Sequence, residues 1–224
     1  MTSIQIDRLV RSRRKTLTLV VRPDGTLEVR APLGISAARI QGFVDSHAQW
    51  IEKQRQRVKA AAPPPSHNFV EGEKILYLGR ECTLVFSSHD RPALRLEGST
   101  FLLRRSAAPK ARQIFIDWYK DQARELIAER MQVLSGKNGF KAGLLRISSA
   151  RTRWGSCSSR GTLSFTYRLV MAPPAIIDYV IVHELVHLKV QNHSREFWNK
   201  VAQIMPEYHQ HRSWLRKNGK FLVL

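Results

Sequence analysis

Cysteine, acidic side chains and long apolar runs are all scarce in this sequence of 224 residues. Its two cysteines, Cys82 and Cys157, are too few for a disulfide framework and lack CxxC spacing, so we expect both to be reduced and structural. No stretch approaches the roughly 18 apolar residues of a membrane span, and the N-terminus lacks the apolar run of a signal peptide. These absences predict a cytoplasmic protein without a membrane segment.

The shortage of acidic residues leaves a strongly basic chain, with 18 Asp and Glu against 37 Lys and Arg and a net charge of +19 at pH 7. Such a charge concentrates polyanions, and contacts of Lys and Arg with phosphates make binding steeply salt-dependent. A nucleotide, a nucleic acid or an acidic protein would profit from it. A basic surface also simply maintains solubility, and we favour that interpretation because no nucleic-acid motif accompanies the charge.

The most informative feature that is present is the segment His183-Glu184-Leu185-Val186-His187. Residues at i and i+4 lie on one helix face with Cβ atoms roughly 5–6 Å apart, so both imidazoles can reach one zinc ion at about 2.0–2.1 Å. Glu184 lies about 100° further round the helix. That position suits a general base better than a ligand. The pattern predicts a metal-dependent hydrolase with one zinc ion per chain.

A third ligand has to come from outside this helical turn, and His193 is the candidate. In a continuous helix His193 would lie some 80° off the ligand face, since each residue adds about 100°. Gln191-Asn192 offers a stop because Asn tolerates the left-handed cap conformation, and Ser194 offers an N-cap oxygen for the next helix. The chain can then fold His193 back to the metal.

Other assignments stand beside this one. Glu207 would be the third ligand if a downstream helix donates a carboxylate, as in gluzincins, whereas His209 and His211 are weaker ligands that can instead stabilise a transition state. Val190 occupies the place of the metzincin turn glycine, so a strict metzincin turn is not expected. The structural alternative is an apolar core helix whose histidines are only hydrogen-bonded.

Six short segments between residues 151 and 198 form a recognisable pattern: Arg153-Trp154-Gly155-Ser156-Cys157, Leu163-Ser164-Phe165, Ala172-Pro173-Pro174, His183 to His187, Asn192-His193-Ser194 and Phe197-Trp198. Together they closely resemble the YgjP-like family of bacterial metal-dependent hydrolases, which is related to the SprT and WLM zinc peptidases. The resemblance implies a zincin-like catalytic fold with His183, His187 and His193 as zinc ligands and Glu184 as the base. It leaves the scissile bond open, because the family has been described both as peptidases and as nucleotide pyrophosphatases acting on UTP.

Three functions therefore compete. We favour a zinc metallopeptidase acting on a polypeptide, and the alternatives are a metal-dependent UTP pyrophosphatase and a nucleic-acid-associated binding protein with a basic face remote from the metal site. A peptidase predicts a groove beside an edge strand, and the strand 163–165 would supply it unless that strand is interior. A nucleotide hydrolase predicts cations converging on the metal, and five lie near the motif in sequence: Arg151, Arg153, Arg168, Lys189 and Arg195.

The hydrophobic pattern predicts an α+β enzyme, with a β-rich N-terminal region (1–105) packed on a zincin-like C-terminal region (106–224) that holds the HExxH helix. The first region is expected to contain a hairpin of strands 15–21 and 27–31, a helix from an N-cap at Ser36 to Ile51, a proline-rich linker at 60–65 and a second β-rich block at 75–103. The second is expected to contain a long helix over 109–134 that Gly136 and Asn138 end, two strands around a Ser/Gly turn within 151–170, and the motif helix, which begins at Pro173-Pro174.

Overall fold

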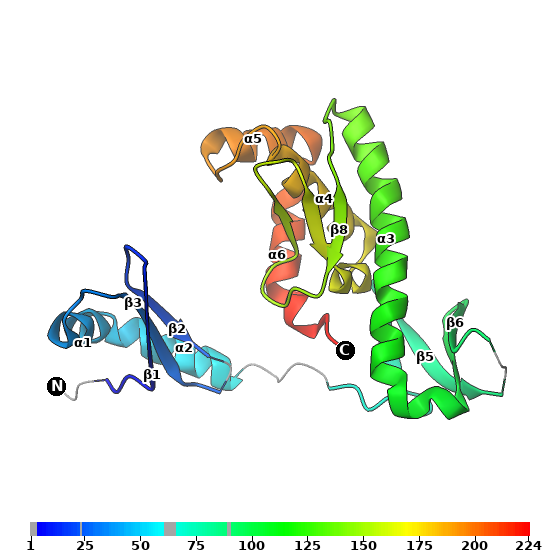
Figure 1. Cartoon of the computed structure of the whole chain (residues 1–224), viewed down its shortest axis with the longest axis horizontal. Helices are drawn as coiled ribbons and strands as arrows, with labels where there is room; N and C mark the ends of the chain where they lie inside the picture. The colour runs from blue at the N-terminus through cyan, green and yellow to red at the C-terminus, as the bar shows by residue number, and fades with distance from the viewer. Residues whose placement is uncertain (1–3, 23, 61–65, 89–90) are drawn as a thin grey trace. The chain divides into compact units, whose positions relative to one another are not determined.

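The computed structural model describes residues 4–22, 24–60, 66–88 and 91–224, and it combines helices with three small sheets, which confirms the α+β class (Figure 1). The chain divides into two compact units, Met1–Pro63 and Pro64–Leu224. The division falls in the predicted proline-rich linker, of which 61–65 lie outside the described residues. The boundary predicted at 105/106 falls inside the second unit, where strands before that point share a core with helices after it.

The first unit is a three-stranded sheet with two helices. Its strands, in the spatial order β1-β3-β2, are β1 (Arg8–Ser12), β2 (Thr18–Val21) and β3 (Leu27–Pro32), and its helices are α1 (Ala37–Ser46) and α2 (Ala48–Ala60). The β2–β3 hairpin is confirmed, although Pro23 of its turn lies outside the described residues. The Ser36 N-cap is also confirmed, since its hydroxyl accepts the Arg39 N–H at 3.3 Å. The single predicted helix is divided at His47, whose main chain is not helical.

The core of the first unit comes from one face of β3 and the inner faces of the helices. Its fully buried members are Leu27, Val29, Ala31, Ile40, Val44 and Ile51. Alternate residues of β3 point inward because side chains alternate across a strand. This small core is separate from the larger one of the second unit.

The second unit begins with a four-stranded sheet in the order β4-β5-β7-β6. Its strands are β4 (Lys74–Tyr77), β5 (Arg80–Ser87), β6 (Leu94–Glu97) and β7 (Thr100–Arg104). The inner strands β5 and β7 are parallel, whereas the outer strands pair antiparallel. Phe101 of β7 packs edge-on against Phe115 of the following helix, with ring centroids 5.0 Å apart. The predicted second β-rich block therefore belongs to the core of this unit.

A 3-10 helix (Arg105–Lys110) leads into α3 (Ala111–Lys137), which runs the length of the second unit in Figure 1. The predicted long helix is thus confirmed, with its end three residues later than expected because Gly136 is accommodated in the last turn and Asn138 forms the C-cap. The N-terminal part of α3 packs on the β4–β7 sheet and the C-terminal part on β8 and the motif helix. The helix α3 thereby joins the two halves of this unit.

The second sheet has three short strands, β8 (Leu145–Ser148), β9 (Gly155–Cys157) and β10 (Leu163–Thr166), in the order β8-β10-β9. The two predicted strands around a Ser/Gly turn are confirmed as β9 and β10, whereas β8 was not foreseen. A 3-10 helix (Tyr167–Met171) and then α4 (Pro174–Val186), α5 (Arg195–Ile204), α6 (Tyr208–Asn218) and a last 3-10 turn (Gly219–Phe221) complete the chain. No helix within the described ranges is long and apolar enough to cross a membrane.

Candidate metal centre

The helix α4 carries the HExxH motif at its C-terminal end. It begins as predicted, with Pro174 in the first turn, where the missing N–H costs nothing. Most residues of α4 are buried, on all faces of the helix, and Ile181 and Leu185 are fully shielded from solvent. A helix that is apolar on every face is a fixed part of the core. The imidazoles of His183 and His187 are therefore attached to a rigid support.

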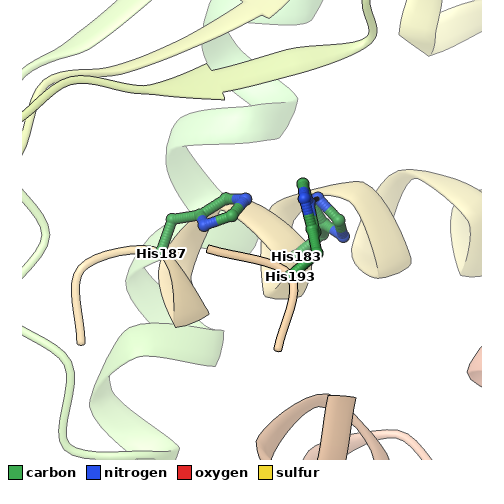
Figure 2. Close-up of side chains that lie close together, drawn as sticks. All are labelled: His183, His187 and His193. Carbon is green, nitrogen blue, oxygen red and sulfur yellow. Dashed lines mark hydrogen bonds between the residues drawn. The ribbon is translucent and has the colours of Figure 1, made fainter. Parts of the chain in front are cut away.

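The chain leaves the helix directly after Val186, and His187 forms the C-cap. The stop predicted at Gln191-Asn192 is wrong: the helix ends earlier, in a turn in which the Val190 N–H bonds to the Val186 carbonyl at 2.9 Å, and no left-handed Asn is needed. The predicted cap of the next helix is confirmed, since the Ser194 hydroxyl accepts the Phe197 N–H. Between the two helices the loop turns back and carries His193 towards α4 (Figure 2).

The three histidines meet at one point (Figure 2). Each of His183, His187 and His193 offers a ring nitrogen, and these nitrogens all lie within 4.8 Å of one another. The Nε2 atoms of His183 and His193 are 3.0 Å apart. This is the only such cluster of metal-ligating side chains in the described part of the chain, and Glu207 does not belong to it.

Neighbouring groups orient the imidazoles. The Nδ1 of His187 lies 3.0 Å from the Val190 carbonyl, so it carries the proton of that bond and leaves Nε2 as the free lone pair. Beneath the cluster the buried ring of Phe197 packs on all three imidazoles, with centroid distances of 4.9, 4.5 and 4.8 Å to His183, His187 and His193. An oriented, partly apolar cluster of this kind is what a metal site requires around its ligands.

The charge state of the cluster also suits a cation. Burial, with a smaller contribution from the neighbouring His187 and His193, lowers the pKa of His183 to about 3. Burial likewise lowers the pKa of His193. Both rings are therefore neutral at pH 7 and present lone pairs, which is the form that binds metal. Three imidazoles whose ring nitrogens converge fit a zinc ion, because ligands at about 2.0–2.1 Å from a tetrahedral ion lie roughly 3.3 Å from each other.

Glu184 lies beside the cluster and is not one of its members, as the sequence predicted. It is only 5% exposed, and burial raises the pKa of its carboxyl to about 7, against a smaller opposing effect of Arg153. Its side chain packs on Gly155 of β9 so closely that a Cβ there would be 2.6 Å from Glu184 Cγ. A carboxyl group with a pKa near neutrality can both accept and return a proton.

A cavity of about 280 Å³ opens beside the imidazoles, and the strand β9 forms one side of it. Its lining combines β9 with the motif and the loop: Gly155, Ser156, Cys157, His183, Glu184, His187, Gln191 and His193. β9 is an edge strand, whereas β10 lies between β8 and β9. The expectation that the strand 163–165 offers a free edge is therefore wrong, because the unforeseen β8 pairs with it, and its interior alternative is confirmed.

The five cations near the motif in sequence do not line the cavity of the three histidines. Lys189 lies over the ring of Phe140, 4.6 Å from its centroid, and Arg151, Arg153 and Arg168 line a neighbouring cavity. Two residues that sequence reasoning missed, Tyr179 and Arg212, line a cavity of about 270 Å³ together with His183 and Glu184. Tyr179 lies one helical turn before His183, a spacing that could have identified it, but nothing local marks Arg212.

The two weaker histidine candidates do not belong to the cluster of three imidazoles. The ring centroid of His209 lies 3.9 Å from that of Tyr208, and the ring centroid of His211 lies 6.1 Å from that of Tyr179. Neither lines the two cavities at His183. Tyr179 and Arg212, in contrast, line a cavity together with His183 and Glu184. Both cysteines are free, as expected.

Two histidines one helical turn apart, a third returned by a loop and a buried carboxyl group beside them have the arrangement of an HExxH metal site. The chain belongs to the YgjP-like family, because the model of the YgjP-like metallopeptidase domain matches residues 15–218. The resemblance seen in the motifs is thereby confirmed. The match covers most of both units.

Solved structures and curated proteins add little to the family match. The chain is similar to the zymogen of the metallopeptidase abylysin from Pyrococcus abyssi, with 22% identity over 42% of this chain and 93% of that one and a TM-score of 0.38. For the jannalysin zymogen from Methanocaldococcus jannaschii the values are 19% identity, 41% and 94% coverage and a TM-score of 0.37. A search of curated proteins finds no match.

Proposed function

We propose that this protein is a zinc-dependent metallopeptidase. His183, His187 and His193 hold the ion, and Glu184 is the general base. The observation that favours a peptide substrate is the edge strand β9, which lines the cavity of the three imidazoles. An edge strand binds an extended chain through main-chain hydrogen bonds, independently of the side chains of that chain.

The register of β9 specifies which of its residues are available for such pairing. The Thr166 N–H bonds to the Trp154 carbonyl at 3.0 Å, and the Ser158 N–H bonds to the Thr162 carbonyl at 2.9 Å. Hydrogen-bonded and open positions alternate along an antiparallel pair, so the main chains of Gly155 and Cys157 point away from β10. A substrate segment would pair with these two residues and lie along the metal cavity.

When bound, the zinc ion would supply Lewis acidity that polarises the scissile carbonyl and lowers the pKa of a water molecule. Glu184 removes a proton from the attacking water and returns it to the leaving amine nitrogen, which its pKa of about 7 permits. Tyr179 and Arg212 line the adjoining cavity with His183 and Glu184, where a developing oxyanion would need donors. The edge strand holds the scissile bond beside these groups.

The nucleotide alternative predicts converging cations, but no Lys or Arg lines the cavity of the three histidines, and Arg212 is the single cation that lines the adjoining cavity at His183 and Glu184. Phosphoryl transfer recruits such cations, often with a second metal, to neutralise the developing charge. The arrangement of the site therefore favours amide hydrolysis over pyrophosphate release. A nucleic-acid-binding role would require neither Glu184 nor the edge strand.

A paired assay of wild type and Glu184→Gln tests the proposal. Each zinc-loaded protein is incubated with a mixed peptide library and, separately, with UTP plus divalent metal, and products are followed by mass spectrometry. We expect wild type to cleave peptides and Glu184→Gln to lose the roughly 10²–10⁴-fold that a general base contributes while retaining zinc. Glu184-dependent release of pyrophosphate without peptide cleavage would contradict the proposal. So would binding of DNA or RNA with steep salt dependence and no turnover of either substrate.

A further inference from the structure

A third cavity, of about 260 Å³, adjoins the candidate metal centre and is rich in cations. Four of its lining residues are basic: Arg151, Arg153, Arg168 and Lys220. It shares Trp154 and Leu215 with the cavity that contains Glu184, Tyr179 and Arg212. Trp154 also directly precedes Gly155 of the edge strand. A substrate that pairs with β9 would therefore pass next to this cavity.

Carboxylates in the part of the chain that the structure describes balance the positive charge of this basic cavity only in part: Arg153 acts on the Glu184 carboxyl, and Arg151 and Arg168 also line a cavity with the last residue, Leu224. No Asp or Glu lines the basic cavity, and none of its four basic side chains forms an ion pair with a described residue. Burial lowers the pKa of Arg168, and repulsion by Arg151 lowers it further. Four like charges in a cavity that no Asp or Glu lines create a local attraction for an anion.

Arg168 is also held in place before any ligand arrives. Its Nε donates to the Leu222 carbonyl at 2.6 Å and its Nη1 to the Arg151 carbonyl at 3.1 Å. Its guanidinium lies 5.3 Å from the centre of the Trp154 ring. These contacts fix the group but leave its charge in place, because carbonyl oxygens carry no formal charge. A fixed guanidinium loses little entropy on binding a planar carboxylate.

We propose that the basic cavity is a specificity subsite for an acidic side chain of the substrate polypeptide. The inference rests on the proposed peptidase function and names its substrate class: chains with Asp or Glu close to the scissile bond. A carboxylate fits because arginine binds it through two parallel N–H···O bonds. The three basic residues Arg151, Arg168 and Lys220 are absent from the linings of both cavities at His183, which favours a substrate side chain over a phosphate at the reacting centre.

The test combines Arg151→Gln with Lys220→Gln, because both side chains are exposed. Arg168 stays unchanged because its hydrogen bond to the Leu222 carbonyl supports the fold, and Arg153 stays unchanged because it acts on Glu184. The matched control combines Lys110→Gln with Lys137→Gln, which remove the same charge at the two ends of α3. Substrates are peptides that differ only in Glu, Gln or Lys at each position flanking the scissile bond. We expect wild type and control to cleave the Glu peptide about tenfold faster than the Gln peptide. The Arg151 and Lys220 double variant should lose that preference without losing activity on the Gln peptide.

Charge reversal and a binding measurement complete the experiment. Arg151→Glu with Lys220→Glu should shift the preference towards the Lys peptide. Fluorescence anisotropy of labelled peptides on zinc-loaded Glu184→Gln measures the subsite without turnover, and the Glu peptide should bind about tenfold more tightly than the Gln peptide.

The outcomes separate the inference from the proposed function. Peptide cleavage without an acidic preference, or a preference that survives Arg151→Gln with Lys220→Gln, would overturn the subsite and leave the peptidase standing. Charge-selective peptide binding that depends on Arg151 and Lys220, with no cleavage of any peptide by wild type, would support the subsite and overturn the peptidase. UTP that displaces the Glu peptide and is hydrolysed by wild type would overturn the carboxylate assignment in favour of a phosphate.

Discussion

Gly155 and Glu184 approach each other so closely that no side chain fits between them. A Cβ on Gly155 would lie 2.6 Å from both Cγ and Oε1 of Glu184. The glycine is needed for this approach and not for a left-handed backbone, because its φ lies outside that region. The edge strand therefore fixes the position of the buried carboxyl group, and a change in the strand is transmitted directly to the proposed base.

Gly155→Ala should displace Glu184 and reduce peptidase activity by about 10- to 100-fold, since a misplacement of about 1 Å in a catalytic group has effects of that size. Zinc content and the circular dichroism spectrum should stay unchanged. Gly136→Ala is the matched control: it adds the same methyl group to α3, where nothing lies within 4 Å, and should leave activity intact. Full activity of Gly155→Ala would show that the contact does not position the base.

Each of His183→Ala, His187→Ala and His193→Ala should reduce bound zinc from about one ion per chain to a small fraction, because one lost ligand of three weakens the whole site. Elemental analysis after gel filtration measures the zinc bound per chain. Glu207→Ala, which changes the rejected ligand candidate, should retain full occupancy. Full occupancy in His193→Ala together with zinc loss in Glu207→Ala would reverse that assignment.

Glu28 should make the first unit sensitive to acid. It lies on β3, is 2% exposed, and forms ion pairs with Arg8, Arg22 and Arg30. Hydrogen bonds from Arg22 and Arg30 lower its pKa from 4.5 to about 2. Since the folded state favours the ionised form, the stabilisation is complete above pH 4.5 and is lost as the pH falls towards 2.

Glu28→Gln should therefore flatten the acid-side decrease of stability in the first unit. Hydrogen exchange of the β3 amides as a function of pH measures this unit separately from the second. Glu97→Gln, at an exposed ion pair with Arg95 in the second unit, is the control and should leave the pH dependence of β3 unchanged. An unaltered pH dependence in Glu28→Gln would show that these ion pairs do not stabilise the folded state.

The ion pair between Arg130 of α3 and Asp178 of α4 should stabilise the support of the metal site. Arg130 donates through Nε and Nη2 to the two carboxylate oxygens, at 2.8 and 2.5 Å. Asp178→Ala should lower the free energy of unfolding of the second unit by about 1–2 kcal/mol, as loss of a partly buried, bidentate charged bond does. Urea unfolding followed by circular dichroism measures this free energy of unfolding.

The control for this ion pair is Asp121→Ala, whose partner Arg124 lies on the same helix. The two side chains of that pair are 66% and 62% exposed, so its loss should cost no more than about 0.5 kcal/mol. Equal effects of Asp178→Ala and Asp121→Ala would contradict a stabilising role for the contact between α3 and α4. Zinc binding should persist in both variants, because neither side chain contacts the imidazoles.

Features set by neighbours in sequence could be predicted from the sequence. The spacing of His183 and His187 places both rings on one helix face, Pro174 starts that helix, and the Ser194 cap fixes where the next one begins. The return of His193 needed only that the helix end before it. The exact stop was missed because a tight turn at 187–190 replaced the expected left-handed residue.

Features that depend on distant pairing could not be predicted in this way. Whether β10 is an edge or an interior strand depends on β8, which pairs with it. The paired residues Leu145 and Leu163 are 18 positions apart in the chain, and β8 shows no strong alternating pattern. The position of the boundary between the two units also depends on distant contacts. Residues 66–105 belong to the second unit because β5 and β7 share a hydrophobic core with α3.

The sequence by itself determined the composition of the candidate site: three imidazoles, one carboxyl group and the helix that carries two of the imidazoles. These follow from helical periodicity and capping, which act over a few residues. Only the tertiary structure decided the surroundings of that site: the free edge at β9, the approach of Gly155 to Glu184, and the place of Arg212 beside His183. Contacts between residues far apart in the chain depend on which apolar faces pack together, and local patterns do not encode that choice.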